Sequence, residues 1–266
     1  MMKDYQIQRF HSTRLASADV FETGRKRHHI TGLVELDVTE SRRKIKALNK
    51  GQKVRISFNA WLVAVIATTV KRHETVAAYL SGKNKRMIFN DINVSFLVEK
   101  DMGESRVPIP LLILKANAES LQAITEKIKM AKESKLRADE VVLMQKASLA
   151  EKLYFHLPGF VRRRFWVWLL KHPRLAFKKM GNVAITSVGM MGKLQGWFIP
   201  ISIHPLCFGI GSVIKKPVVV DDQIVIREML QMSVLIDHDV VDGADMARFL
   251  TALTMNIEHG LLLDSK

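Results

Sequence analysis

The chain has 266 residues, of which 48% are hydrophobic, so it can form one large domain or two small ones and does not have the composition of a disordered protein. Cys207 is its only cysteine, which excludes an internal disulfide and a zinc site built from several thiolates. Its net charge of +15 attracts anions, so nucleic acid, anionic membrane and phosphorylated cofactors are the partner classes to consider.

Other features of the sequence narrow these classes. No RNA- or DNA-reading motif, zinc-finger spacing or repeat accompanies the charge, so we expect no nucleic-acid partner. The N-terminal residues contain no apolar run of signal-peptide length. The longest apolar run, AWLVAVIATTV from Ala60, is too short to span a bilayer. We therefore expect a cytoplasmic protein.

Strands and helices are predicted to alternate in the first part of the chain. Residues 29–38 have the pattern of a strand, and Thr39 is predicted to cap the helix that follows at 40–49. Residues 57–80 are apolar all round in their first half and polar afterwards. This pattern indicates a core helix that emerges toward solvent.

Two further strands and an amphipathic helix are predicted next. The strands occupy 92–99 and 107–114, and the second carries Pro108 and Pro110, which favours a place near a sheet edge because proline cannot donate to the ladder. The helix occupies 118–134, where apolar side chains recur at helical spacing.

The last third of the sequence is rich in strands. Short apolar segments separated by glycines and turn residues are found at 182–188, 206–213, 217–220, 224–226 and 231–237. A last helix is predicted from about Ala244 to Glu258. Since no Pro-, Gly- or Ser-rich linker interrupts the chain, we expect a single domain over 1–266.

The segment DHDVVDGADMARFL, from Asp237, joins the end of a predicted strand to the start of this helix. Polar side chains at such a junction are held rigidly at a rim, so His238 is a candidate catalytic base. A structural interpretation competes with this one. In it, Asp242 is the helix N-cap and His238 is a strand-end histidine with satisfied hydrogen bonds.

A family resemblance favours the catalytic interpretation. HDVVDG, at His238–Gly243, resembles the His-x-x-x-Asp-Gly motif of chloramphenicol acetyltransferase and of the acyltransferase catalytic domain of 2-oxo acid dehydrogenase complexes. Other segments resemble the same family in the same order: HHITGLVELDVT, NDINVSFLVEKD, VAITSVGMMG, HPLCFGIGSVIKKPVVVDDQIVI and QMSVLIDHDVVDGADMARFL. The resemblance covers most of the chain and is nearest to the dehydrogenase-complex branch.

The resemblance implies a fold and a reaction. The fold is the α/β coenzyme A-dependent acyltransferase fold, a mixed sheet flanked by helices, in a homotrimer or a multiple of trimers. The reaction moves an acyl group between coenzyme A and an acceptor that the sequence does not identify, by direct attack in a ternary complex. We expect coenzyme A or acyl-coenzyme A as substrate, no metal, and a stand-alone catalytic domain without a covalently bound lipoyl group. The alternative is a non-catalytic oligomeric scaffold or partner-binding module that keeps the fold.

The resemblance also assigns roles to individual residues. His238 is the base that takes the proton of the acceptor, and Thr186 is the hydroxyl that stabilises the tetrahedral oxyanion, with Ser187 beside it. Because side chains alternate along a strand, only one of Thr186 and Ser187 is expected to face the site. Asp242 is expected to order the loop around His238, with Arg14 as a candidate partner. Cys207 is expected to be a small buried hydrophobe rather than a nucleophile.

Two departures from the family pattern are informative. Asp239 follows His238 where the dehydrogenase branch has arginine, which leaves the acceptor uncertain. Residues 153–180 form an insertion that contains seven Lys or Arg, no Asp or Glu, and several aromatic residues. Two interpretations stay open for this insertion: a helical hairpin packed on the domain or on a neighbouring subunit, and an interfacial helix that lies on an anionic membrane.

Overall fold

The computed structural model describes residues 5, 7, 13–51, 55–101, 106–133, 154–188 and 195–264. Its elements follow in the order α1 (Thr13–Gly24), β1 (His29–Asp37), α2 (Thr39–Leu48), α3 (Phe58–Arg72), the short 3-10 helix η1 (Glu74–Ala77), β2 (Tyr79–Ser81), β3 (Lys85–Met87), β4 (Val94–Asp101), β5 (Arg106–Ile113), α4 (Leu121–Glu133), α6 (Gly159–Leu170), α7 (Pro173–Met180), β6 (Val183–Ser187), β7 (Leu206–Val220), β8 (Gln223–Asp237) and α8 (Gly243–Glu258).

A six-stranded mixed sheet organises these elements. Its strands lie in the order β1-β8-β7-β6-β4-β5, and β2 and β3 form a separate two-stranded sheet. The central strand β6 runs parallel to both β4 and β7, whereas the remaining pairs are antiparallel. This arrangement confirms the predicted α/β fold with a mixed sheet flanked by helices.

Side chains that alternate along the strands divide the sheet into two faces. One face carries Phe96, Ile185, Phe208 and Val234, which join the main core together with the almost fully buried helix α3. The opposite face carries the small buried cluster Ala184, Cys207 and Leu235. One face of the short strand β6 therefore packs against the main core, and its other face carries only the small cluster.

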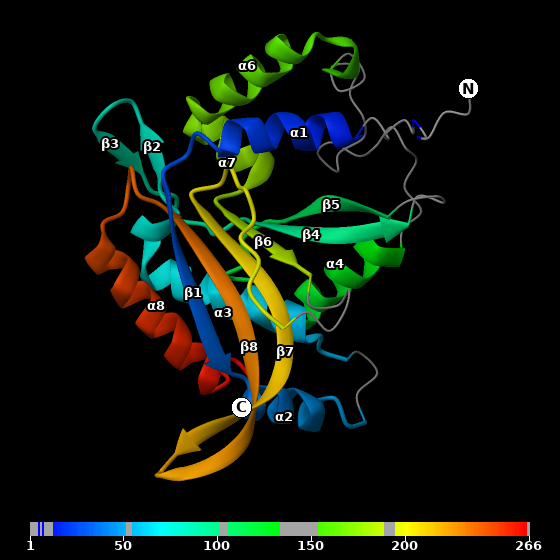
Figure 1. Cartoon of the computed structure of the whole chain (residues 1–266), viewed down its shortest axis with the longest axis vertical. Helices are drawn as coiled ribbons and strands as arrows, with labels where there is room; N and C mark the ends of the chain where they lie inside the picture. Colours follow the sequence, from blue (N-terminus) through cyan, green and yellow to red (C-terminus); the bar gives the residue numbers. More distant parts are fainter. Residues whose placement is uncertain are drawn as a thin grey trace.

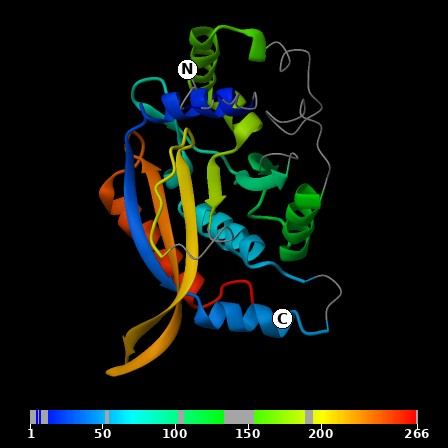
Figure 2. The ribbon, with the colours of Figure 1, turned by 45° about the vertical axis from the view of Figure 1, so that its right-hand side comes forward.

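The helices gather at different ends of the molecule. Figures 1 and 2 show α1, α6 and α7 together at one end, whereas α2 and the C-terminus lie at the other. The hairpin of β7 and β8 projects beyond the body at this second end (Figure 1). Its turn consists of Asp221 and Asp222, both with positive φ, as a two-residue hairpin of this type requires.

The structure confirms several predicted elements. The strands β4 and β5 fall where the sequence predicts them, and β5 with its two prolines lies at the sheet edge. The segments predicted as separate strands after residue 205 are instead two continuous strands, β7 and β8, each of 15 residues. Gly209 and Gly211 lie inside β7 and do not end it; a Cβ at Gly211 would approach the carbonyl of Gln231, and the register shifts by a bulge between Ile210 and Val213.

The prediction that Thr39 caps α2 is wrong. Thr39 is the first helical residue, and its hydroxyl accepts a hydrogen bond from the backbone N–H of Glu228 at 2.8 Å, so it links the helix to β8. The backbone N–H of Thr39 donates to the carboxylate of Asp37 at 2.9 Å. The sequence around Thr39 is typical of a helix N-cap, but its hydroxyl instead binds the backbone of β8, which is distant in the sequence.

Residues 154–180 of the predicted insertion include α6 and α7; α6 packs on α7 and on α1. Asp19 of α1 is buried and accepts hydrogen bonds from Tyr154 at 2.9 Å and from Arg162 at 2.7 Å. The indole of Trp166 donates to the Tyr154 hydroxyl at 2.9 Å. The described part of the segment therefore contains two helices in contact, of which α6 is tied to α1 by a buried polar network.

Candidate active site

His238 lies directly after β8, at the start of the turn that leads to α8. Its side chain is exposed, and its backbone N–H donates to the carbonyl of His28 at 2.8 Å. Nδ1 of the ring lies 2.8 Å from the carbonyl oxygen of Val241. A carbonyl can only accept, so Nδ1 carries the proton and Nε2 of the neutral ring has a free lone pair. This is the tautomer that a general base needs.

Asp242 begins the helix that follows. Its carboxylate accepts a hydrogen bond from the backbone N–H of Asp245 at 3.0 Å and so caps α8. This hydrogen bond, more than the nearby Arg248 and Arg86, holds the pKa of Asp242 below its usual value. The N-cap interpretation of Asp242 is therefore correct, and its carboxylate marks the start of α8, four residues after His238.

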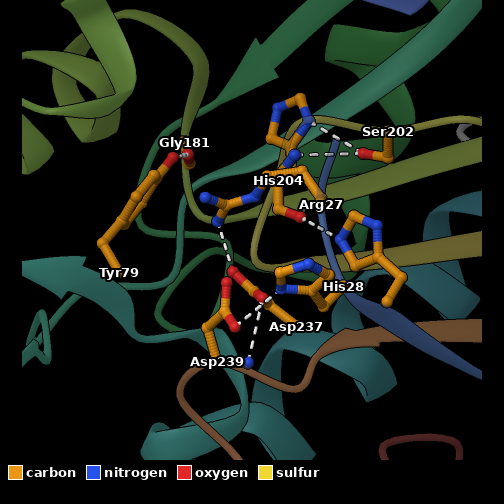
Figure 3. A network of polar contacts seen from close by, with 9 residues as sticks. Arg27, His28, Tyr79, Gly181, Ser202, His204, Asp237 and Asp239 are labelled. Atoms are coloured by element: carbon orange, nitrogen blue, oxygen red, sulfur yellow. Dashed lines mark hydrogen bonds and ion pairs between the residues drawn. The ribbon is translucent and has the colours of Figure 1, made fainter. Parts of the chain in front are cut away.

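An arginine that the sequence analysis did not single out holds the end of β8 in place. Arg27, in the connection between α1 and β1, forms an ion pair with Asp237, whose side chain is 0% exposed. The second carboxylate oxygen of Asp237 accepts the backbone N–H of Asp239 at 3.2 Å. Figure 3 shows Arg27 and Asp237 pointing toward each other. No local signal marks this pair, because the two residues are far apart in the sequence.

Asp239, which stands in the position of the family's arginine, also has a partner. Its carboxylate lies 2.9 Å from Nδ1 of His28, and this hydrogen bond raises the pKa of His28. The His28 side chain is 75% exposed and the Asp239 side chain 35% exposed. The Asp239 carboxylate therefore binds the side chain of His28, the residue just before β1. The backbone carbonyl of the same residue accepts the hydrogen bond from His238.

A chain of histidine contacts connects this region to β6. Nε2 of His29 lies 2.9 Å from the carbonyl oxygen of His204, and Nε2 of His204 donates to the carbonyl of Met180 at 3.0 Å. The other ring nitrogen of His204 faces the hydroxyl of Ser202 at 3.3 Å (Figure 3). Burial lowers the pKa of His204 to about 4, so the ring is neutral at pH 7. The neutral ring fixes the end of α7 just before β6.

Gly181 fixes the same junction from the other side. Its φ is +75°, and a Cβ at this position would lie 2.3 Å from the carbonyl oxygen of Asn93. The Tyr79 hydroxyl donates to the Gly181 carbonyl (Figure 3). The close backbone approach and the positive φ together require glycine here, and they set the direction in which β6 begins.

Thr186 lies near the end of β6, on the face that carries Ala184. It lines a cavity of about 590 Å³ between the sheet and the helices α1, α6 and α7. Ser187, the last residue of β6, borders this cavity and also a second cleft on the other side of the sheet. Only one of the two hydroxyl residues was expected to face the site, but both border the cavity, because the strand ends at Ser187. The glycine-rich turn predicted after β6 falls at 189–192, outside the described residues.

The second cleft is basic. It has a volume of about 620 Å³, and Arg42, Arg55, Lys129 and Lys132 line it. It lies at the N-terminus of α3, where the Ser57 hydroxyl accepts the backbone N–H of Ala60 at 3.1 Å. Cations and a helix N-terminus both attract anions, so this cleft is suited to a phosphorylated ligand.

Thr186 and His238 do not meet within one chain. Thr186 pairs with Gly209 of β7, and Gly209 pairs with Ser233 of β8. His238 lies five residues beyond Ser233, which corresponds to about 16 Å along the strand direction. A reaction that uses both groups therefore needs the His238 of another copy of the chain.

Neither Cys207 nor the described acidic residues indicate a thiol nucleophile or a metal site. Cys207 is buried, as predicted, and burial raises the pKa of its thiol to about 12. The described part of the chain holds no cluster of three or more His, Cys, Asp or Glu that could bind a metal ion. Among the described helices, none is both long and apolar enough to cross a membrane.

Comparison with known sequences identifies related proteins. A sequence profile described as "2-oxoacid dehydrogenases acyltransferase (catalytic domain)" matches residues 3–143 and 174–263. Residues 144–173, which include α6, lie outside this match. The chain is 26% identical over 240 residues to the dihydrolipoyllysine-residue acetyltransferase component of the pyruvate dehydrogenase complex of Corynebacterium glutamicum. The match covers 86% of this chain but 30% of that protein, so the chain spans about a third of the relative's length.

Solved structures share the fold. A probable dihydrolipoamide acetyltransferase from Listeria monocytogenes superimposes with a TM-score of 0.69 at 19% identity, over 99% of this chain and 98% of the other. The dihydrolipoamide acetyltransferase of Azotobacter vinelandii superimposes with a TM-score of 0.67 at 18% identity, over 96% and 92% of the two chains. A serine, a histidine and an asparagine of that protein were investigated for their role in its catalytic mechanism.

The buried ion pair at the end of β8 leads to a prediction about stability. Replacing Arg27 by methionine keeps most of the side-chain volume but leaves the buried carboxylate of Asp237 without its cation. We expect Arg27→Met to lower the free energy of unfolding by about 3–5 kcal/mol, measured by urea denaturation.

The control removes an exposed ion pair. Arg248→Ala breaks the pair with Asp245, in which the arginine side chain is 66% exposed. It should cost less than about 1 kcal/mol. Equal losses in the two variants would contradict a structural role for the Arg27 pair.

Proposed function

This chain belongs to the 2-oxoacid dehydrogenase acyltransferase family, whose catalytic domain matches most of its sequence, and on that premise we propose that it transfers an acyl group between coenzyme A and a small-molecule acceptor. The observation that carries the proposal is the tautomer of His238. The Val241 carbonyl fixes the proton on Nδ1 and leaves the lone pair of Nε2 available to accept a proton.

The proposed reaction is a direct attack on a thioester. Nε2 of His238 takes the proton from a thiol, amine or hydroxyl of the acceptor as its lone pair attacks the thioester carbonyl. The Thr186 hydroxyl donates a hydrogen bond to the oxyanion of the tetrahedral intermediate. The carbon–sulfur bond then breaks, and His238 returns the proton to the departing coenzyme A thiolate. Asp242 acts as a positioning residue, because it caps the helix that follows the loop.

The spacing of the three residues supports these roles. The serine, histidine and asparagine investigated in the Azotobacter vinelandii protein are spaced in its sequence as Thr186, His238 and Asp242 are spaced here. Threonine keeps the hydroxyl of the serine. Aspartate replaces an asparagine with a side chain of the same shape that is also a good helix N-cap.

We propose that the working form is a homotrimer or a multiple of trimers. Thr186 and His238 are too far apart in one chain to act on the same carbonyl, so a site that uses both lies between neighbouring subunits. A cyclic assembly closes such head-to-tail contacts. Each interface then contains the Thr186 of one subunit and the His238 of its neighbour.

The catalytic pair can be tested by substitution and by mixing. His238→Ala should lower the turnover of acetyl-coenzyme A with a thiol acceptor by about a hundredfold or more, because the base is lost. Thr186→Val keeps the shape and removes the hydroxyl, and should lower kcat by about 10²–10³. His259→Ala is the matched control, since Nδ1 of His259 also contacts a backbone carbonyl, that of Met255, at 2.7 Å.

Mixing the two inactive variants tests the shared site. Under conditions of subunit exchange, some interfaces combine the intact Thr186 of one variant with the intact His238 of the other, and activity should partly return. Near-normal turnover of His238→Ala would refute the mechanism, and a monomeric active protein would refute the shared site. A folded trimer with no turnover on any acyl donor would favour the alternative, a non-catalytic scaffold.

We propose that the basic cleft binds the phosphates of coenzyme A. Ser187 borders both this cleft and the cavity of Thr186, so a ligand whose phosphates contact Arg55 and Lys129 can extend toward the end of β6. Arg42 pairs with Glu228 at 2.8 Å and lies over the ring of Phe58, which holds it at the cleft. These contacts support a preformed anion site.

Substitution at this cleft should separate binding from chemistry. Arg55→Ala should raise the KM for coenzyme A by about tenfold or more, the value of one lost charge-assisted hydrogen bond, and leave kcat within about twofold. Arg43→Ala is the control, because Arg43 follows Arg42 in α2 and pairs with Glu40 but does not line the cleft. Unchanged KM in both Arg55→Ala and Lys129→Ala would contradict this assignment.

We propose a cytoplasmic protein that can also contact an anionic membrane surface through α6. The observation that favours contact is the exposed face of this helix, on which Phe160 and Trp168 are 63% and 46% exposed beside the exposed Arg163 and Arg164. Aromatic rings suit the headgroup boundary, and the cations suit lipid phosphates.

Co-sedimentation with liposomes tests this contact. Binding should require anionic lipid, weaken as salt rises, and fall strongly in Trp168→Ala. Trp197→Ala, which changes an exposed tryptophan outside α6, should bind as the wild type does. Absence of binding to anionic liposomes would refute the membrane contact and leave α6 as a packed structural helix.

A further inference from the structure

The cavity beside Thr186 is large and mostly apolar. Its walls include Val20 and Phe21 of α1, Leu97 and Leu112 of the sheet, Trp166 of α6 and Met180 of α7. Ala184 and Cys207 form the floor. His204 also lines the cavity but is neutral, and Glu99 and Lys179 are the charged residues in the lining. Such a cavity favours a hydrocarbon ligand over a polar one.

The wall contributed by α6 is held firmly. Trp166 is 6% exposed and donates its indole N–H to Tyr154, which in turn donates to the buried Asp19. Arg162 completes this network at 2.7 Å from Asp19. The wall is thus part of a packed unit with α1.

This wall is a property of the chain rather than of the family pattern. Trp166 lies within residues 144–173, outside the two segments that the family profile matches. The cavity therefore has one boundary built by residues of the family core, which include Thr186, and another built by additional sequence. A difference at this boundary changes which substrate the cavity accepts.

We propose that this cavity binds the hydrocarbon chain of a medium-length acyl group, so that the protein selects acyl donors longer than acetyl. The inference rests on the proposed function, in which the thioester carbonyl sits at Thr186. The chain attached to that carbonyl then extends from Thr186 into the cavity, while the coenzyme lies toward the basic cleft. At about 590 Å³ the cavity falls within the range of small-molecule sites, and an acetyl group would leave most of it empty.

The proposal gives a quantitative expectation. Each methylene that enters an apolar site gains about fourfold in affinity, from the transfer free energy of one methylene group. The kcat/KM of linear acyl-coenzyme A donors should therefore rise by about fourfold per methylene from acetyl through octanoyl, at a fixed concentration of a small thiol acceptor. It should level off once the chain fills the cavity.

Filling the cavity should reverse this preference. Ala16 of α1 lines the cavity, whereas Ala18 of the same helix is exposed and does not. Ala16→Phe should lower the ratio of kcat/KM for octanoyl-coenzyme A to kcat/KM for acetyl-coenzyme A by about tenfold or more, because the longer chain competes with the new ring for the cavity. Ala18→Phe should behave as the wild type does.

A second pair of variants approaches the cavity from the opposite wall. Leu112 of β5 lines it, and Leu114, just beyond the strand, is 52% exposed. Leu112→Trp should reproduce the loss seen with Ala16→Phe, and Leu114→Trp should not. Thermal unfolding of each variant identifies any that fails to fold, and the other pair then decides the result.

A binding measurement without turnover distinguishes this proposal from the proposed function. Calorimetric titration with sodium octanoate should show binding to the wild type and a tenfold or greater loss in Ala16→Phe. Octanoate binding with no acyl transfer from any donor would refute the proposed function and retain the cavity. Acetyl transfer with no gain from longer donors and no octanoate binding would refute the cavity proposal and retain the acyltransferase.

Discussion

A buried ion pair between Arg27 and Asp237 holds together the parts on which the rest of the site depends. It joins the end of β8, from which His238 projects, to the segment that connects α1 with β1. Because a buried carboxylate without a cation is costly, the two segments have one favourable arrangement. The same segment carries α1, which forms a wall of the apolar cavity. The position of the histidine loop and the shape of the cavity are thus coupled through one contact.

The short strand β6 organises the two ligand-sized spaces. It lies in the middle of the sheet and has only five residues, so both faces of its end are accessible. An apolar cavity lies on one side and a basic cleft on the other, and Ser187 borders both. A molecule with an anionic end and a hydrocarbon end, joined by a reactive carbonyl, matches this division of charge and hydrophobicity.

Much of this arrangement was predictable because its signals are local. The two prolines placed β5 at an edge, the spacing around His238 placed it at a strand end, and Asp242 had the sequence context of an N-cap. The family and its fold also followed from segments that resemble the family's in the same order, and the profile match confirms the family. Contacts between distant segments were not predictable. Arg27 has no local mark that pairs it with Asp237, and nothing near Thr39 shows that its hydroxyl binds β8.

Cys207 has a consequence for the chemical durability of such a site. Its thiol lies on the floor of the cavity, where the chain of a thioester would rest. A thiolate there would set a negative charge against that chain and would be nucleophilic toward any thioester carbonyl that entered the cavity, since the thiolate is the nucleophilic form. Burial raises the pKa of the thiol to about 12, so it stays protonated at neutral pH. The same apolar surroundings that favour a hydrocarbon chain therefore protect the protein from acylating itself.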